Sequence, residues 1–354
     1  MSDLTEQWRA AVSAAAASGS ALCLRGGGSK DFYGRSPSGA VFDTRGHAGV
    51  VAYEPTELVV TVRAGTSMIE LENLLAAHGQ MLPFEPPRFG AATVGGCVAA
   101  GLSGPRRMAA GGVRDYMLGV KLIDGRAEVL AFGGQVMKNV AGYDVPRLLA
   151  GSLGTLGLIL EVSLKVLPMP VREASLRFAM DEGEAVARLN AWGGQPLPLS
   201  ASAWHAGELL VRLSGAGAAV ASARARLGGE LVPDDEAARL WADLREQLHP
   251  FFTASDEPLW RLAVPTTAPA LDLAGDRLIE WGGGLRWLRT RLPAESVRAR
   301  VAAAGGHATA YRGIARDGEV FQPLPAALMN IHRRLKQSFD PAGIFNPGRL
   351  YRGI

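Results

Sequence analysis

The sequence predicts an α+β protein, and three observations support this class. Residues 1–170 alternate short apolar strands with helical segments, and residues 171–315 alternate Ala- and Arg-rich helical stretches with further short strands. Glycines gather at turns between the apolar stretches, above all in residues 91–168. Because glycine weakens any helix or strand that contains it, this density indicates a backbone that passes close to a bulky polar ligand.

The elements of residues 1–88 follow from local patterns. An amphipathic helix is expected around 10–17, and an apolar strand runs into the glycine turn of ALCLRGGGSK (21–30). Two strands are expected in 49–66, separated by a break at 54–57. Thr66 or Ser67 can cap the next helix, which the pattern ends at Gly79. The segment MLPFEPPRFG (81–90) is a restricted loop, suited to the wall of a binding site.

The rest of the chain divides at its prolines. Strands are expected at 117–123, 127–132 and 158–168, with Asp124-Gly125 as a tight hairpin turn. Pro168 and Pro170 indicate a domain boundary. Six tryptophans follow in 171–315, where core packing explains them better than a partner surface does. A tail at 316–354 contains a helix at 324–340 and a proline–glycine turn; its basic residues, Lys336 among them, fit a solvated helix face better than a docking surface.

Composition excludes several classes of protein. The hydrophobic share of 48% and the charged share of 20% are typical of soluble globular proteins, and a net charge of +3 gives no support for nucleic-acid binding. Cys23 and Cys97 are too few for a disulfide framework, a zinc site or an iron–sulfur cluster. We expect no transmembrane segment and no targeting signal, since long uncharged apolar stretches and a basic leader are both absent. A cytoplasmic location is therefore expected.

Two familiar phosphate-binding motifs do not match the glycine turns. RGGGSK lacks the spacing of a P-loop, and GSLGTLG (151–157) has the spacing GxxGxxG where a Rossmann fingerprint needs GxGxxG. Consecutive glycines after a strand can still converge their N–H groups on an anion, with charge-assisted contacts from Arg25 and Lys30. Taken alone, RGGGSK fits a structural turn equally well.

The order of the motifs carries a resemblance to a known family. RGGG, the proline loop, TVGG (93–96), GGVRDY (111–116), KNVAGYD (138–144) and GSLGTLG together resemble the FAD-binding domain of the vanillyl-alcohol oxidase, or p-cresol methylhydroxylase, superfamily. The tail LKQSFDPAGIFNPGRLY resembles the end of its D-2-hydroxyacid dehydrogenase branch. GGHATAYRG (305–313) and GEVFQPLPAALM (318–329) are most similar to the FAD-binding subunits of bacterial glycolate oxidases.

This resemblance implies an architecture and a noncovalent FAD site. A two-lobed FAD-binding domain is expected at 1–170, with lobes at about 1–88 and 89–170, followed by a smaller α+β cap or partner domain at 171–315 and a C-terminal segment at 316–354 that packs back near the flavin. Covalent relatives often carry histidine at the end of the glycine loop, where this chain has Ser29 and Lys30. The implied FAD-binding residues are Gly26, Gly27, Gly28, Ser29 and Lys30 in the first pyrophosphate loop; Pro86, Thr93, Gly95 and Gly96 along the pyrophosphate and isoalloxazine; Gly101, Gly112 and Asp115 in close turns; Gly157 and Ile159 over the adenosine and ribityl portion; and Asn346 in the tail.

The resemblance also implies a function without identifying catalytic residues. Substrate-oxidising relatives carry a histidine-rich metal motif, whereas the six histidines here are scattered and His307 stands alone in the comparable stretch, so no metal is expected. The implied function is the FAD-binding subunit of a multi-subunit glycolate, or 2-hydroxyacid, dehydrogenase. It would act as an electron relay or an accessory flavoprotein, with a related catalytic flavoprotein and an iron–sulfur subunit as partners.

Several alternatives stay open. The chain could be a self-sufficient FAD-dependent alcohol or hydroxyacid oxidoreductase, or a non-catalytic scaffold, although a scaffold could exchange its glycines for alanine and gain stability. The substrate of the complex could be glycolate or D-lactate. The complex could also attach to the inner face of the cell membrane. Five cations are candidates for tuning the flavin, although surface or phosphate-contacting roles fit each better: Lys30, Arg88, Arg106, Arg107 and Arg114.

Overall fold

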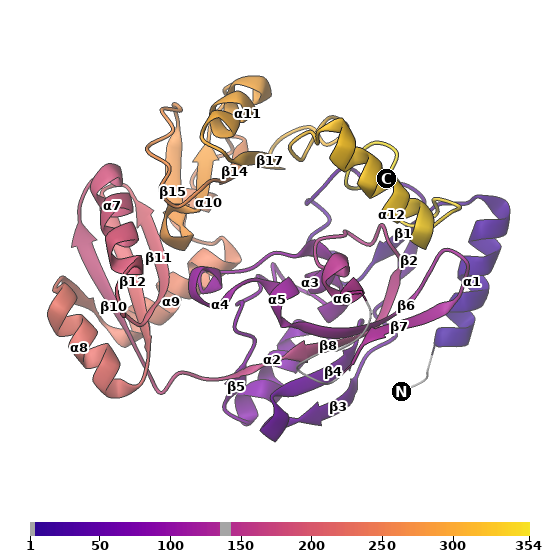
Figure 1. The fold of residues 1–354 in the computed structure, drawn as a ribbon, viewed down its shortest axis with the longest axis horizontal. Helices are drawn as coiled ribbons and strands as arrows, with labels where there is room; N and C mark the ends of the chain where they lie inside the picture. The colour runs from indigo at the N-terminus through magenta and orange to yellow at the C-terminus, as the bar shows by residue number, and fades with distance from the viewer. Residues whose placement is uncertain (1–3, 135–142) are drawn as a thin grey trace.

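The α+β class is confirmed by the computed structural model, which describes residues 4–134 and 143–354. Figure 1 shows two bodies side by side: one built from the first half of the chain with the tail, the other from the cap strands and their helices. The KNVAGYD motif lies largely outside the described residues, because 138–142 are not among them.

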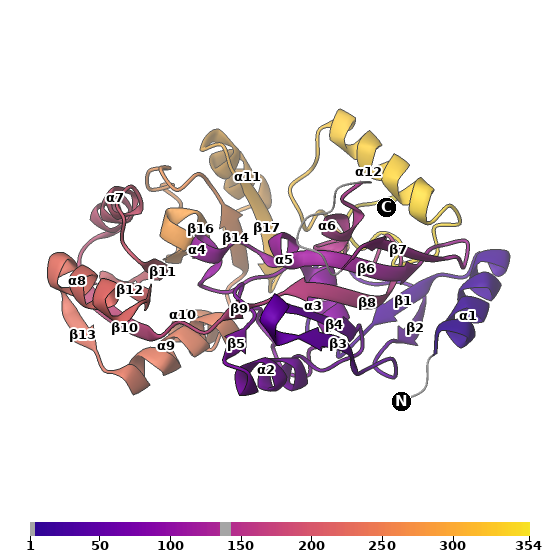
Figure 2. The same cartoon turned by 60° about the horizontal axis from the view of Figure 1, so that its bottom comes forward.

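A five-stranded antiparallel sheet forms the core of the first body. Its strands lie in the order β3 (Val50–Glu54), β4 (Val59–Arg63), β8 (Leu158–Lys165), β6 (Met117–Ile123) and β7 (Val129–Gly133). The central strand β8 is buried along nearly its whole length, as its apolar run predicts. Figure 2 shows α2 (Met68–Ala77) below this sheet, and α6 (Val145–Leu149) and α12 (Ala326–Phe339) above it.

A small parallel pair joins the N-terminal strand to the tail. β1 (Leu22–Arg25) pairs with β2 (Ala40–Asp43), and on its other side Leu22 forms a bridge with Phe345. The backbone bonds Leu22 N to Ile344 O (2.7 Å) and Asn346 N to Leu22 O (3.0 Å) make this bridge. Trp8 of α1 (Thr5–Ser18) packs into the same apolar cluster as Phe345. The tail is therefore an integral part of the first body.

The second body is an eight-stranded antiparallel sheet with helices packed against it. Its strands lie in the order β13 (Glu230–Val232), β10 (Arg172–Ala179), β12 (Glu208–Gly215), β11 (Leu199–His205), β15 (Asp276–Glu280), β16 (Leu285–Arg289), β14 (Leu259–Ala263) and β17 (His307–Arg312). Its helices are α7 (Glu182–Gly193), α8 (Gly217–Leu227), α9 (Asp234–Glu246), α10 (Pro250–Thr253) and α11 (Ala294–Ala303). Trp204, Trp241, Trp260 and Trp287 are buried, which confirms the core role expected for most of the tryptophans.

Short elements complete the two bodies. Within the sheets, η1 (Pro55–Glu57) lies between β3 and β4, and η2 (Trp281–Gly283) lies between β15 and β16. The others are β5 (Gln80–Met81), α3 (Val94–Ala100), α4 (Arg107–Ala110), α5 (Val113–Tyr116) and β9 (Leu167–Pro168). One apolar cluster spans the junction, with Tyr33, Ala100 and Leu153 from the first body packed among cap residues such as Trp287 and Tyr311. Within the described residues, no helix is long and apolar enough to cross a membrane.

Two local predictions need correction. The turn at Asp124-Gly125 is longer than the expected tight hairpin, because β6 ends at Ile123 and β7 begins only at Val129. The Asp124 carboxylate closes this loop by accepting the N–H groups of Arg126 and Glu128, both at 2.9 Å. Lys336 is buried and does not lie on a solvated face of the tail helix.

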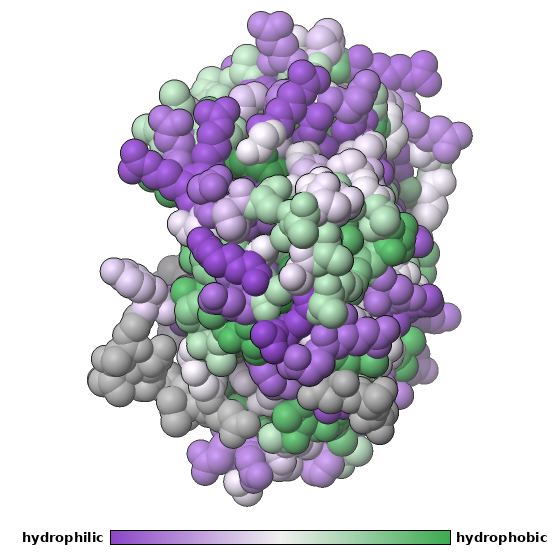
Figure 3. Space-filling view, turned by 90° about the vertical axis from the view of Figure 1, so that its right-hand side faces the viewer, coloured by the Kyte–Doolittle hydropathy of each residue, from purple (hydrophilic) through white to green (hydrophobic). Residues whose placement is uncertain are grey.

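Leu328 and Ile331 are large exposed apolar residues of that helix. Figure 3 shows the side of the molecule that lies at the right of Figure 1, where hydrophilic and hydrophobic side chains are intermixed.

Candidate cofactor site

The first glycine loop packs directly on the second lobe. A Cβ at Gly27 would lie 1.3 Å from the carbonyl oxygen of Ala91, and one at Gly26 would lie 2.2 Å from Thr93 Oγ1. The glycine pattern in the sequence predicts the close approach of a ligand. At these two positions, however, the atoms approached belong to the protein, so Gly26 and Gly27 are required for the docking of two loops.

An open trough runs along the junction of these loops. One hollow is lined by the glycine loop, Thr93, Gly96 and the tail residues Asn346 and Arg349. A second hollow is lined by Gly95, Gly157, Ile159 and neighbouring residues. Both include Leu24, Arg25, Gly26, Gly96, Ala99, Leu153 and Asn346, so they form one elongated site. This shape suits a long, extended ligand better than a single phosphate group.

Most of the predicted cofactor residues line this trough, and four do not. Those that line it are Gly26, Gly27, Gly28, Ser29, Lys30, Thr93, Gly95, Gly96, Gly157, Ile159 and Asn346. Pro86, Gly101, Gly112 and Asp115 lie outside its walls. Gly101 ends α3 with a φ of +66° against Gly151, and Asp115 Oδ2 accepts the Gly112 N–H at 2.8 Å as part of a helix cap. Pro86 is buried in the proline loop.

Asn346 joins three separate segments at the floor of the trough. Its Oδ1 accepts the N–H of Leu24 in β1 (2.7 Å), and its Nδ2 donates to the carbonyl of Leu153 in the GSLGTLG turn (2.6 Å). Its φ of +41° is a left-handed conformation, which asparagine tolerates better than most residues. Asn346 is therefore a structural crosslink that also faces the site.

The polar end of the trough is rich in cations. Lys30 Nζ donates to the Arg88 carbonyl at 3.3 Å and lies 5.5 Å from the centre of the Phe89 ring; burial lowers its pKa. Arg25 pairs with Asp31 at 2.6 Å. Burial, followed by the nearby charge of Arg316, lowers the pKa of Arg349 to about 10. Sequence reasoning missed Arg349, although it stands three residues after Asn346 in the same tail motif. This end of the trough therefore favours an anion such as a pyrophosphate.

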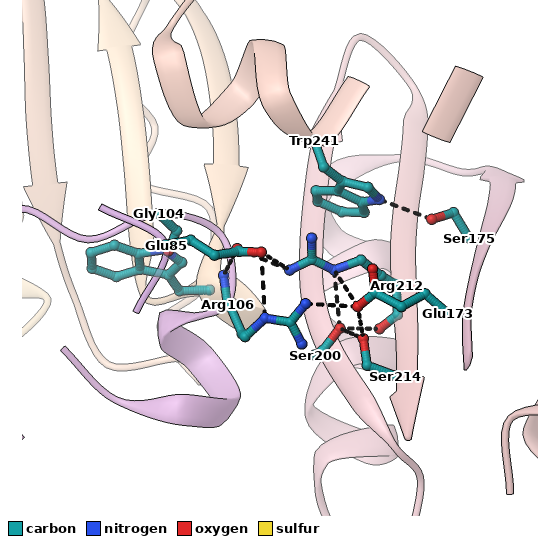
Figure 4. A network of polar contacts seen from close by, with 10 residues as sticks. Glu85, Gly104, Arg106, Glu173, Ser175, Ser200, Arg212, Ser214 and Trp241 are labelled. Carbon is teal, nitrogen blue, oxygen red and sulfur yellow. Dashed lines mark hydrogen bonds and ion pairs between the residues drawn. The ribbon is translucent and has the colours of Figure 1, made fainter. Parts of the chain in front are cut away.

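A carboxylate network ties the proline loop to the cap. Glu85 accepts the backbone N–H of Arg106 at 2.9 Å and the guanidinium of Arg212 at 2.9 Å, and Arg106 Nη2 donates to Glu173 at 2.7 Å. Figure 4 shows these four side chains converging, with Trp241 and Ser200 beside Arg212. Sequence reasoning missed the network because its members lie far apart along the chain.

A second carboxylate from the cap holds the end of the same loop. Glu246 of α9 accepts the backbone N–H groups of Arg88 (3.1 Å) and Phe89 (2.9 Å), and Arg88 also lies 3.4 Å from Glu72. Lys30, which lines the trough, contacts the Arg88 carbonyl and the Phe89 ring. Because Glu246 of the cap holds the backbone of these two residues, the cap helps to position the segment against which Lys30 packs.

Comparisons with known proteins agree with this geometry. The family model described as "FAD binding domain" matches residues 3–133, and the model "FAD linked oxidases, C-terminal domain" matches residues 293–350. The glycolate oxidase subunit GlcE of Escherichia coli K12 is 48% identical over 93% of this chain and 92% of its own length. This chain belongs to the GlcE family. The predicted resemblance and the FAD cofactor are thereby confirmed.

More distant relatives share only part of the chain. The glycolate oxidase subunit GlcD of Bacillus subtilis is 29% identical over 39% of this chain and 30% of its own length. A D-lactate dehydrogenase of Anaerostipes hadrus is 34% identical over 36% of this chain and 26% of its own. Among solved structures, alkyldihydroxyacetonephosphate synthase superposes with a TM-score of 0.67 at 16% identity, covering 97% of this chain and 74% of that one, which shows the shared fold.

The residues of the trough fit FAD. Among the residues that the structure describes, a Cβ at Gly96 would meet only Thr93 Oγ1, at 3.2 Å, so the described side chains leave the space in front of Gly96 open to a ligand. Lys30, Arg25 and Arg349 supply positive charge for a pyrophosphate, and the elongated shape accommodates an extended dinucleotide. In residues 4–134 and 143–354, no three His, Cys, Asp or Glu side chains are grouped so as to hold a metal ion.

Proposed function

We propose that this GlcE family member is the FAD-binding subunit of a multi-subunit glycolate dehydrogenase, and that it relays electrons or serves as an accessory flavoprotein. The observation that carries the proposal is the near full-length match to a glycolate oxidase subunit in a chain whose elongated trough fits FAD. Its partners would be a related catalytic flavoprotein, for which the partial match to GlcD is the support, and an iron–sulfur subunit.

The roles of this chain's own residues follow from the geometry. The Gly26–Lys30 loop and Thr93 would receive the pyrophosphate, with Lys30 and Arg349 balancing its charge. Gly157 and Ile159 would hold the adenosine and ribityl portion, and Asn346 would keep β1 and the GSLGTLG turn at the right separation. Bound FAD supplies a redox group that can exchange electrons singly as well as in pairs, which suits a relay. No covalent link is proposed, because Ser29 and Lys30 replace the histidine of covalent relatives.

The four predicted residues outside the trough have indirect roles in this proposal. Gly101 and Pro86 shape the segments before and after the binding loops, and Gly112 with Asp115 caps the short helix α5. The complex would act in the cytoplasm or at the inner face of the cell membrane, held there by its partners.

The experiment that tests the proposal is a visible spectrum of the purified chain, followed by anaerobic addition of glycolate. We expect flavin bands that bleach only after the partner subunits are added. Bleaching by glycolate alone would replace the relay with a self-sufficient oxidoreductase. A chain that stays colourless after incubation with FAD would be a scaffold, and the proposal would be wrong.

A further inference from the structure

One carboxylate of the cap holds two consecutive residues of the FAD-binding body. Glu246, the last residue of α9, accepts the backbone N–H groups of Arg88 and Phe89 at 3.1 and 2.9 Å. Its carboxylate also lies 3.5 Å from Arg88 Nε and 3.0 Å from Arg245 Nε, and only 14% of the side chain is exposed. Because a charge buried among several donors is costly to displace, these contacts fix both the carboxylate and the backbone that it binds.

The backbone of Phe89 has a conformation that needs such a hold. Its φ of +53° lies in the left-handed region, which bulky residues seldom adopt. A strained backbone of this kind persists only where its surroundings determine it. Glu246 contributes to that determination, since it binds the N–H of Phe89 itself and the N–H of the residue before it. Without the carboxylate, we expect the segment of Arg88 and Phe89, here called the 88–89 segment, to relax.

The end of the glycine loop packs on the 88–89 segment. Lys30 Nζ donates to the Arg88 carbonyl at 3.3 Å and lies 5.5 Å from the centre of the Phe89 ring, and the ring centre of Phe32 lies 5.7 Å from that of Phe89. Among the described residues, the only other hydrogen bond of this ammonium goes to Ser29 Oγ, at 3.4 Å. An ammonium has three N–H groups, so one is left for a ligand in the trough that Lys30 lines. The position of this third donor therefore depends on the segment that Glu246 holds.

The charge of Glu246 also favours the ammonium form of Lys30. Burial lowers the pKa of Lys30, whereas Glu246 is among the groups that raise it. In the part of the chain that the structure describes, Lys30 forms no ion pair with Glu246, whose carboxylate is instead close to Arg88 and Arg245. Glu246 thus supports the cation without occupying its N–H groups, and the cation stays available to an anionic ligand.

We infer that Glu246 is a positioning residue through which the cap controls FAD binding: it holds the 88–89 segment, and the segment fixes the Lys30 ammonium in the trough. The inference rests on the proposed function and deepens it, since Glu246 is not among the described residues that line the trough. Coupling between two sites is reciprocal. Bound FAD should therefore tighten the hold of Glu246 on the N–H groups of Arg88 and Phe89.

The test is a double-mutant cycle on the Kd of the FAD-free, full-length chain for FAD, measured by flavin fluorescence. Lys30→Met should raise the Kd at least about tenfold, because it removes a charged donor. Glu246→Ala should raise it about five- to tenfold in the wild-type chain, but less than about twofold in Lys30→Met, where the cation that it positions is gone. Equal effects of Glu246→Ala in the two backgrounds would overturn the inference.

Two further variants separate positioning from a general loosening of the cap. Glu246→Gln retains an oxygen that can accept N–H groups and should keep the Kd within about threefold of wild type. If it binds FAD as weakly as Glu246→Ala does, the charge of Glu246 and not its hold on the backbone is what matters, and the inference is wrong. Glu236→Ala is the matched control, because Glu236 lies on the same helix and pairs with Arg177 inside the cap at 2.7 Å. It should leave the Kd unchanged.

Hydrogen exchange and a second ligand complete the test. The amides of Arg88 and Phe89 should exchange at least about threefold more slowly with FAD bound to the wild-type chain, but not with FAD saturating Lys30→Met. ADP carries the pyrophosphate without the flavin, so the cycle is repeated with it. The same non-additivity with ADP in a chain that never takes up FAD would support the coupling while rejecting the proposed function. A wild-type chain that binds neither ligand at millimolar concentration would reject both.

Discussion

Lys336 Nζ lies 2.6 Å from Asp340 Oδ2, one helical turn further along the tail, and both residues are buried. The ammonium also donates to the carbonyls of Thr155 and Phe345, each at 2.8 Å, so its three N–H groups are all engaged. Asp340 in turn accepts the N–H of Phe345 at 2.8 Å. This cluster connects the tail helix, the GSLGTLG turn and the strand-like segment that carries Asn346 into the cofactor trough.

Lys336→Met should destabilise the protein strongly, because it leaves the Asp340 carboxylate buried without its cation. Removing one member of a buried pair typically costs about 3–5 kcal/mol. We expect a loss of that size in the free energy of unfolding measured with urea at pH 7, together with weaker FAD retention as Asn346 loses its anchor. Arg334→Met, on the exposed side of the same helix, is the control and should change the free energy by less than about 0.5 kcal/mol. Two variants of equal stability would contradict this account.

The tail illustrates what sequence alone can predict. Its helix and its proline–glycine turn follow from local patterns, and both are present. The burial of Lys336 does not follow, because lysine at this position matches the solvated face that charged residues usually occupy. Only the fold brings the carbonyl of Thr155, from a distant turn, to its Nζ.

The same distinction holds for the cofactor site. The glycine loops and most of the trough residues could be predicted, since their backbone requirements leave a signature in consecutive positions. The roles of Glu85, Arg212 and Glu246 could not be predicted. Their ion pair and their hydrogen bonds to backbone N–H groups join residues more than a hundred positions apart, and such contacts leave no local pattern in the sequence. Arg107 was named as a tuning cation, but its contact with the Trp281 ring depends on how the cap packs.

Gly27 and Gly96 should respond differently to substitution. Gly27→Ala places a methyl group where the Ala91 carbonyl lies, so we expect both loss of FAD and a lower Tm of the FAD-free chain. At Gly96 the Cβ has room, and the larger Val side chain extends into the trough. Gly96→Val should therefore raise the Kd for FAD at least tenfold while the Tm of the FAD-free chain stays within a few degrees of wild type.

Gly96→Ala is the matched control for that comparison. Its single methyl group meets Thr93 Oγ1, at 3.2 Å, and no other atom of the described residues. Because alanine also favours a helix more than glycine does, this variant should keep most of the affinity. Flavin fluorescence titration gives the Kd values, and calorimetric melting gives the Tm. Stoichiometric FAD in Gly96→Val would move the cofactor away from this face of α3.

Glu85 should couple the cap to the FAD-binding body in a pH-dependent way. Burial raises the pKa of its carboxyl, but the charges of Arg212 and Arg106 outweigh burial, so the net pKa is lowered. A lowered folded-state pKa contributes stability above the pKa of the unfolded chain, and that stability is lost as pH falls through the folded value. Glu85→Gln should thus destabilise the protein by roughly 2–4 kcal/mol at pH 7 and by clearly less near pH 4.

Urea unfolding at the two pH values measures this difference, and limited proteolysis in the 169–171 linker reports whether the cap has loosened. Glu173→Gln is a useful comparison, since Glu173 is more exposed than Glu85 and should cost less. A Glu85→Gln variant with the same deficit at both pH values would mean that packing, and not charge, holds the network together.

Glu280 should have the opposite pH dependence. Burial raises the pKa of this carboxyl to about 7, although the Trp287 hydrogen bond and Arg261 lower it in part. Both folded and unfolded chains hold the proton below about pH 4, so no penalty exists there. As pH rises from the ordinary carboxyl range towards 7, the unfolded chain ionises first and the folded state loses stability by an amount on the order of 3 kcal/mol.

Glu280→Gln keeps an acceptor for Trp287 Nε1 but cannot ionise. We therefore expect it to be more stable than wild type at pH 8 and no more stable at pH 4, in urea unfolding experiments that compare the two proteins at each pH. Contributions from all other titrating groups cancel in that comparison, so a constant difference across the range would show that Glu280 ionises normally in the fold.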